Sequence, residues 1–192
     1  MRIAGSLNAR LRLIAFDYMM EPVRVLALKD IGPLPLPEGV VNVRRGDELD
    51  VPRWQALELE SRGLVDVRDR GIKVDDVNMY HYREKRGQAA NQLQGLPRNF
   101  YLEVRDLISR IDRVIRENPT TMLIRDREVV EKNLLELSEA RLLKIVRLAI
   151  SGGDEFKERM TPEETIIYDA MREIVEVMRS YVKGLVRGEA GG

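Results

Sequence analysis

Residues 125–150, RDREVVEKNLLELSEARLLKIVRLAI, decide how the rest of the chain is interpreted. Their large apolar side chains recur every three or four positions, which places them on one face of an α-helix. Further apolar positions widen this face, namely Leu135, Leu143, Leu148 and Ile150. Because a helix that is apolar over so much of its circumference must be buried from several sides, we expect the central helix of a bundle. Gly152-Gly153 is expected to end it, since glycine readily adopts the left-handed conformation.

The composition limits the classes of protein that the chain can be. Of its 192 residues 44% are apolar and only 5% aromatic, which favours aliphatic helix packing over a β-sandwich core. Lys+Arg and Asp+Glu both number 32, which leaves only a local basic face as a route to nucleic acid. The absence of cysteine excludes disulfides, thiolate catalysis and cysteine-ligated metals. The high, arginine-rich charge content is typical of thermophilic proteins.

The sequence also indicates a soluble protein of the cell interior. No window reaches the roughly 18–20 apolar residues that a membrane span needs. The N-terminal apolar run is interrupted by Arg10, Arg12 and Asp17, so it does not fit a signal peptide. We therefore expect a cytoplasmic protein without a membrane partner.

The first 75 residues predict a small β-rich domain that contains one helix. The β-prone runs are residues 11–16, 23–28, 40–43, 64–67 and 72–74. The proline-rich segment 32–39 is expected to be a loop, because each proline fixes its own φ and pushes the preceding residue into an extended conformation. Pro52 suits the first position of a helix that ends near Arg62, with Trp54 and Leu57 facing inward.

From residue 96 onward the pattern is helical throughout. One helix begins near Pro97 and ends at Asn118-Pro119, and Thr120 or Thr121 can cap the next one. The motif Thr161-Pro162-Glu163-Glu164 predicts a capping box at the start of the last helix. The residues expected on the inner face of that helix are Ile167, Met171, Ile174, Val175, Met178 and Val182. The fold class is therefore α+β, with a β-rich domain at 1–75, a partly helical linker at 76–95 and a helical-bundle domain at 96–192.

No group of residues points to catalysis, to a metal or to a cofactor. His81 is the only histidine, which removes histidine metal clusters and catalytic triads, and we expect it to be partly exposed in the linker. Gly152-Gly153 lacks the lysine and the strand–helix context of a phosphate-binding loop. The acidic pairs Asp75-Asp76 and Glu163-Glu164 could bind a metal, although helix capping explains them more simply. An enzyme with a carboxylate-bound metal remains an alternative without a nominated site.

The main alternative is a nucleic-acid-binding module with a winged-helix-like N-terminal domain. The arginines that would serve it are Arg44, Arg45, Arg53, Arg62, Arg68 and Arg70. Acidic residues alternate with these arginines, so their field largely cancels. Trp54 could stack on a base, but a lone tryptophan without basic and aromatic neighbours is more typical of a core or interface anchor.

Several segments resemble the subunits of the GINS complex. VRVLALKDI (23–31), a Pro/Gly loop and GDELDVPRWQALELESRGLVDV (46–67) are similar to the small β-rich GINS domain. LPRNFYLEVRDLI (96–108), EARLLKIVRLA (139–149) and the TPEE start of the last helix (161–164) are similar to its helical domain. The order, with the β-rich domain first, resembles the subunit type that is circularly permuted relative to its partner subunits.

This resemblance implies a non-catalytic scaffold of archaeal DNA replication, without a cofactor. GINS subunits form a heterotetramer that joins the replicative MCM helicase to a Cdc45/RecJ-like protein at the fork, so the chain would act at the nucleoid. Direct contact with DNA stays open. We expect the helical domain to share apolar residues between its core and a subunit interface, namely Phe100, Val104, Leu107, Ile111, Leu134, Leu137, Leu142, Ile145 and Val146. In the small domain, Trp54 and Leu57 are the expected interface or core anchors.

Overall fold

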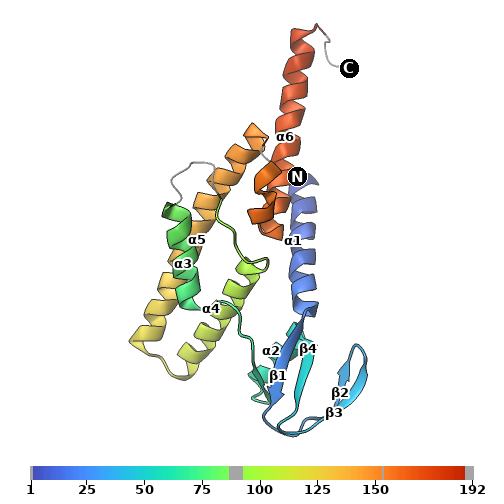
Figure 1. Cartoon of the computed structure of the whole chain (residues 1–192), viewed down its shortest axis with the longest axis vertical. Helices are drawn as coiled ribbons and strands as arrows, with labels where there is room; N and C mark the ends of the chain where they lie inside the picture. The colour runs from blue at the N-terminus through green and yellow to red at the C-terminus, as the bar shows by residue number, and fades with distance from the viewer. Residues whose placement is uncertain (1, 87–92, 153, 189–192) are drawn as a thin grey trace. The chain divides into compact units, whose positions relative to one another are not determined.

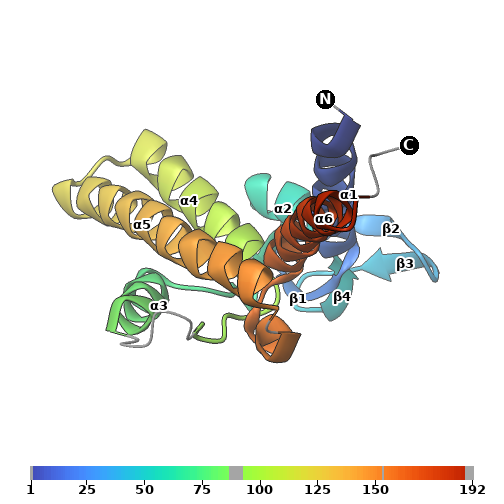
Figure 2. The ribbon, with the colours of Figure 1, turned by 90° about the horizontal axis from the view of Figure 1, so that it is seen from above.

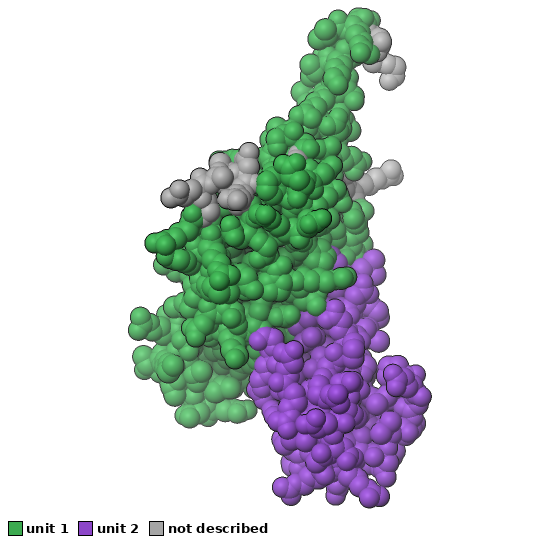
Figure 3. Space-filling view, viewed as in Figure 1, with its two compact units in different colours: residues 1–11, 72–192 green, residues 12–71 purple. Residues whose placement is uncertain are grey.

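The computed structural model describes residues 2–86, 93–152 and 154–188 (Figure 1). It is a mixed α+β protein, with the strands in the N-terminal part and most of the helices after them. The chain divides into two compact units, which Figure 3 shows in different colours. The small unit comprises Arg12–Gly71, and the helical unit comprises Met1–Leu11 and Ile72–Gly192. The predicted boundary at residue 75 therefore lies four residues beyond the boundary between the units.

The prediction of a strand at residues 11–16 is wrong, because these residues belong to the helix α1 (Arg2–Met20). The segment contains no proline, and the alanines, leucines and arginines among its β-prone residues favour a helix. Leu13 and Phe16 are exposed on α1, whereas Tyr18 is buried. The guanidinium carbon of Arg53 lies 4.1 Å from the centre of the Tyr18 ring, a cation–π contact within the small unit.

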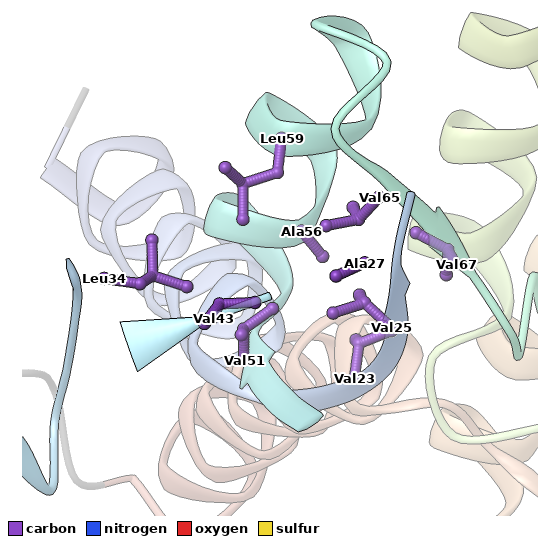
Figure 4. Packing of buried hydrophobic residues seen from close by; sticks show 10 residues of the cluster. All are labelled: Val23, Val25, Ala27, Leu34, Val43, Val51, Ala56, Leu59, Val65 and Val67. Carbon is purple, nitrogen blue, oxygen red and sulfur yellow. The ribbon is translucent and has the colours of Figure 1, made fainter. Parts of the chain in front are cut away.

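The small unit is built on a three-stranded antiparallel sheet with the strand order β4-β1-β5. These strands are β1 (Pro22–Ala27), β4 (Glu48–Pro52) and β5 (Val65–Val67). In β1 the alternate residues Val23, Val25 and Ala27 are buried, which is the pattern of a sheet with one face on a core. Figure 4 shows how side chains from the strands and from the helix α2 (Arg53–Ser61) meet in this core.

The prediction that the proline-rich segment 32–39 is a loop is wrong, because most of this segment forms a strand. β2 (Gly32–Leu36) pairs with β3 (Gly39–Val43) as an antiparallel hairpin. Proline is compatible with such an edge strand, since it favours extended backbone and only its N–H is missing from the ladder. Leu34 and Val43 reach from this hairpin into the core of the small unit (Figure 4).

Trp54 does not face inward as predicted, since 47% of its surface is exposed. The buried face of α2 is formed by Gln55, Ala56 and Leu59, and Leu57 is half-buried. Gln55 fixes this face because its Nε2 donates a hydrogen bond to the carbonyl oxygen of Pro35 at 3.0 Å. Together with the packing of Ala56 and Leu59 in the core, this contact orients the helix, and hydrophobic spacing alone does not reveal it.

The helical unit is organised around α5 (Thr121–Ser151), as expected. It contacts α3 (Val74–Arg86), α4 (Phe100–Glu117) and α6 (Pro162–Val186), and a short 3₁₀-helix (Asp154–Arg159) precedes α6. Figure 2 shows α5 lying between α3 and α4. Residues 74–86, predicted as the end of a strand and part of a linker, form a full helix of this bundle. The rest of the predicted linker includes residues 87–92, which lie outside the described residues.

The ends of α5 agree with the signals in the sequence. Thr120 is its N-cap, and the Oγ1 atom accepts a hydrogen bond from the backbone N–H of Leu123 at 3.3 Å. At the other end, Gly152 has a φ of 88°, the left-handed conformation that closes a helix. A Cβ atom at this position would also lie 3.1 Å from Nη1 of Arg172. The backbone conformation favours glycine here, and a larger residue would also displace the end of the Arg172 side chain slightly.

The capping box at the start of α6 is confirmed. The backbone N–H of Glu164 donates to Oγ1 of Thr161 at 3.4 Å, and that of Thr161 donates to Oε2 of Glu164 at 3.0 Å. We expect Thr161→Ala to lower the free energy of unfolding by about 1 kcal/mol, because one helix N–H then loses its acceptor. Urea denaturation followed by circular dichroism measures this change. Ser180→Ala, at an exposed position of the same helix, is the control, and an equal loss there would contradict the assignment.

Candidate subunit interface

The most unusual surface of the helical unit is a regular line of apolar residues along α6. Six of them follow one another at alternating spacings of four and three, namely Ile167, Met171, Ile174, Met178, Tyr181 and Leu185. We call these six residues the α6 seam. This spacing is the a/d repeat by which one helix packs lengthwise against another.

The α6 seam passes from the body of the helical unit into solvent. Ile167 and Met171 are half-buried, but the last four residues of the seam are between 49 and 59% exposed. From residue 173 to 188 every residue is exposed except Val175 and Gly184, which are half-buried. Figures 1 and 3 show this part of α6 as a projection from the helical unit. The predicted inner face is thus wrong for Ile174, Met178 and Val182, because helical spacing identifies an apolar face without identifying what covers it.

Most of the residues predicted to be shared between the core and a subunit interface lie in the core of this unit. Phe100, Val104, Leu107, Ile111, Leu137 and Ile145 are all buried within the chain. Their apolar surface is used mainly in packing α4 and α5 into the bundle. Leu134 and Val146 are half-buried, and Leu142 is 46% exposed. Among the predicted residues of the helical unit, these three expose the most surface to a partner.

An apolar hollow of about 330 Å³ lies where the α6 seam begins. Its apolar lining comes from Leu11, Tyr101, Leu142, Ile145 and Ile167, and its polar lining comes from Ser138, Glu139, Glu163 and Glu164. Leu142 and Ile167 thus connect the exposed part of α5 with the seam. The hollow extends the candidate interface from the projecting part of α6 onto the bundle.

A buried cluster of charged residues holds the base of α6 in place. At its centre Arg141 of α5 is completely buried. Its Nε donates to Oε1 of Glu164 at 2.6 Å and its Nη2 to Oε2 of the same residue at 2.7 Å. Its Nη1 donates to Oε2 of Glu84 in α3 at 2.8 Å. This bidentate pair and its second carboxylate satisfy a guanidinium that would otherwise be very costly to bury.

Further contacts complete what we call the Arg141 cluster, namely Arg141, Glu84, Glu164, Lys144 and Tyr101. The Lys144 ammonium donates to Oε1 of Glu84 at 2.6 Å, and the Tyr101 hydroxyl donates to Oε1 of Glu164 at 2.7 Å. Burial alone would lower the pKa of Arg141, but its hydrogen bonds and charge interactions with Glu164 and Glu84 raise it above its ordinary value. Burial and the neighbouring Glu164 carboxylate raise the pKa of Tyr101. Both groups therefore stay protonated and can donate hydrogen bonds to the Glu164 carboxylate.

The Arg141 cluster also reaches the backbone of two connecting segments. The guanidinium donates to the carbonyl oxygens of Gln94 at 2.6 Å and Arg159 at 3.0 Å. It thereby links α3, α5, α6 and the segments that precede α4 and α6. The sequence did not predict this cluster, because Glu164 was assigned to helix capping and Arg141 was not singled out. The available signal was position: Arg141 lies four residues after Leu137 and four before Ile145, on the buried face of α5.

The arginines that would bind nucleic acid in the small unit are largely paired with acids. Arg62 pairs with Glu58 at 2.5 Å, Arg70 with Asp66 at 2.5 Å and with Glu60 at 3.3 Å. The same holds for Arg68 with Glu48 at 3.3 Å, and for Arg53 with Glu21 at 4.0 Å. The opposite charges within each pair neutralise one another at short range, so these arginines do not form a basic face for a phosphate backbone.

The described residues contain no group of three histidine or acidic side chains placed to hold a metal ion. Nε2 of His81 lies 2.9 Å from Oε2 of Glu136, so the histidine links α3 to α5. Of the acids considered as ligands, Asp76 accepts the backbone N–H of Lys73 at 2.9 Å, and Glu164 belongs to the Arg141 cluster. In the same part of the chain, no helix is both long and apolar enough to cross a bilayer.

The candidate site is thus a surface for contact with another chain: the exposed part of the α6 seam, the half-exposed positions of α5 and the hollow between them. Its base is held by the Arg141 cluster, whose charges are all turned into the bundle. Comparison with known proteins adds no further identification, because no family model matches the chain and no curated protein matches it.

Proposed function

We propose that this protein is a non-catalytic subunit of a GINS-type DNA replication complex, and that the α6 seam packs against a helix of a partner subunit. The observation that carries the proposal is the seam itself. Four of its six residues expose about half of their surface on a helix whose base is held by buried ion pairs. Apolar surface in such a repeat is stabilised when a second helix covers it.

The order of the two units agrees with the subunit type that the sequence resembles, in which the β-rich domain precedes the helical domain. In a complex of this type the subunits form a heterotetramer that joins the MCM helicase to a Cdc45/RecJ-like protein. The chain would act as a scaffold at the nucleoid of an archaeal cell, and any catalysis would be carried out by its partners. The internal pairing of the small unit's arginines is in keeping with protein contacts as its main role.

Size-exclusion chromatography with light scattering tests this proposal. The full-length chain is mixed with a GINS subunit of the type that carries its helical domain first, and we expect the two to elute together at the mass of a heterotetramer. The purified assembly is then mixed with MCM helicase and a RecJ-like protein, and both are expected to shift into its peak. Separate elution of the two subunits at about 10 μM, where typical specific complexes persist, would contradict the proposal.

A further inference from the structure

Glu163 is the one acid at the start of α6 whose carboxylate is left without a hydrogen bond among the described residues. Both of its oxygen atoms are closed off from solvent and have no partner. Its neighbour Glu164, by contrast, receives hydrogen bonds from Arg141, Tyr101 and the capping box. A buried carboxylate without a donor or a counter-charge is costly, and the positive end of the helix only partly offsets that cost.

The surroundings of Glu163 indicate what is missing. It lines the apolar hollow, together with Tyr101, Leu142 and Ile167, and Glu139 is a second, exposed carboxylate in the same lining. The basic groups of the Arg141 cluster are all turned to Glu84 and Glu164. The hollow therefore combines apolar walls with uncompensated negative charge. This combination fits a side chain with an apolar stem and a cationic end, which is the structure of arginine and lysine.

We propose that the hollow receives a basic side chain, arginine or lysine, from the partner subunit that packs on the α6 seam. The methylene groups would lie against Leu142 and Ile167, and the cation would pair with the carboxylate of Glu163, which lines the same hollow. This inference rests on the proposed function, because the basic residue is carried by the partner. It adds a polar determinant to a seam that is otherwise apolar, and a charge at that point selects one register and one partner.

The isolated full-length chain tests the site with a small probe. N-acetyl-arginine amide is titrated at constant ionic strength while backbone amide signals are followed by NMR. We expect saturable shifts at Thr161–Ile167 and near Leu142, with a dissociation constant of about 10 mM. N-acetyl-citrulline amide, which has the same shape without the charge, is expected to cause no saturable shift. Glu163→Gln is expected to weaken binding of the arginine probe at least about tenfold, since hydrogen bonds to charged groups are the strong ones.

Thermal unfolding supplies a second measurement on the same variants. Glu163→Gln removes an unpaired buried charge, so we expect the melting temperature of the free chain to rise by about 2–4 °C. If Glu163 only supported the helix end, the same change would lower it. Glu173→Gln, at an exposed position of α6, is the matched control and should change neither quantity.

Equal binding of the two probes, full binding by Glu163→Gln or a lower melting temperature of that variant would each overturn the inference. So would the absence of saturable shifts with the arginine probe. Because these measurements use the free chain, they are separate from the test of the proposed function. A chain that binds the arginine probe but does not co-elute with a partner subunit would contradict the proposed assembly alone.

Discussion

Arg141→Met is expected to lower the free energy of unfolding of this protein by about 3–5 kcal/mol, the range measured when one partner of a buried ion pair is removed. Methionine fills much of the same space but leaves the carboxylates of Glu84 and Glu164 without the guanidinium that they share. Lys144 still pairs with Glu84, so the larger part of the loss should come from Glu164. Chemical denaturation followed by far-UV circular dichroism measures the change.

The matched control is Arg147→Met, at an exposed position six residues further along α5. It removes the same charge and adds the same side chain, so a change within about 0.5 kcal/mol is expected there. If Arg141→Met unfolds the chain entirely, Arg141→Lys gives a graded result, because an ammonium cannot reproduce the bidentate contact with Glu164. Loss of less than about 1 kcal/mol in both Arg141 variants would show that the Arg141 cluster contributes little.

The second large effect is expected on assembly rather than on folding. Changing both Met178 and Tyr181 to lysine should weaken the complex with the partner subunit at least about a hundredfold, because each places a charge in the middle of an apolar helix contact. Both side chains are already 59% exposed in the free chain, so its free energy of unfolding should change by less than about 0.5 kcal/mol. Isothermal titration calorimetry for the complex, and urea denaturation for the free chain, separate the two quantities.

A control with the same change in net charge is available on the same helix. Glu173→Gln combined with Ser180→Lys alters two exposed residues outside the α6 seam and also raises the net charge by two. This variant should retain the affinity of the wild type to within about threefold. If both double variants weaken the complex equally, the effect is one of general charge and not of the seam.

Local signals in the sequence predicted much of the helical unit. The apolar breadth of residues 125–150 identified the central helix, and Thr120, Gly152 and the Thr161 capping box marked helix ends that the structure confirms. These features depend on contacts within a few residues, which is why they can be recognised without knowing the rest of the fold. The strand that contains Val23 and Val25 was recognised for the same reason.

The predictions that were wrong, and the features that were not predicted, depend mostly on residues far away in the sequence. Residues 11–16 have β-prone side chains, but they lie within α1, where the helix propensity of the surrounding segment prevails. Trp54 points outward while Gln55 faces the core and bonds to Pro35, twenty residues before Gln55 in the chain. Arg141 can be buried because its guanidinium pairs with Glu84 and Glu164, which lie in two other helices. The apolar periodicity of α6 was visible, but only the structure distinguishes a face covered by the chain from one left open.

The capping box has a geometric consequence for the other end of α6. Because each residue of an α-helix turns by about 100°, the residue at which the helix starts sets the azimuth of every later side chain. Thr161 and Glu164 are held in the bundle, and twenty-one residues separate Glu164 from Leu185. An insertion of one residue before Ile174 would swing the outer four seam residues by more than a quarter of a revolution while leaving their composition unchanged. The length of this segment is thus as much a part of the recognition surface as the residues that form it.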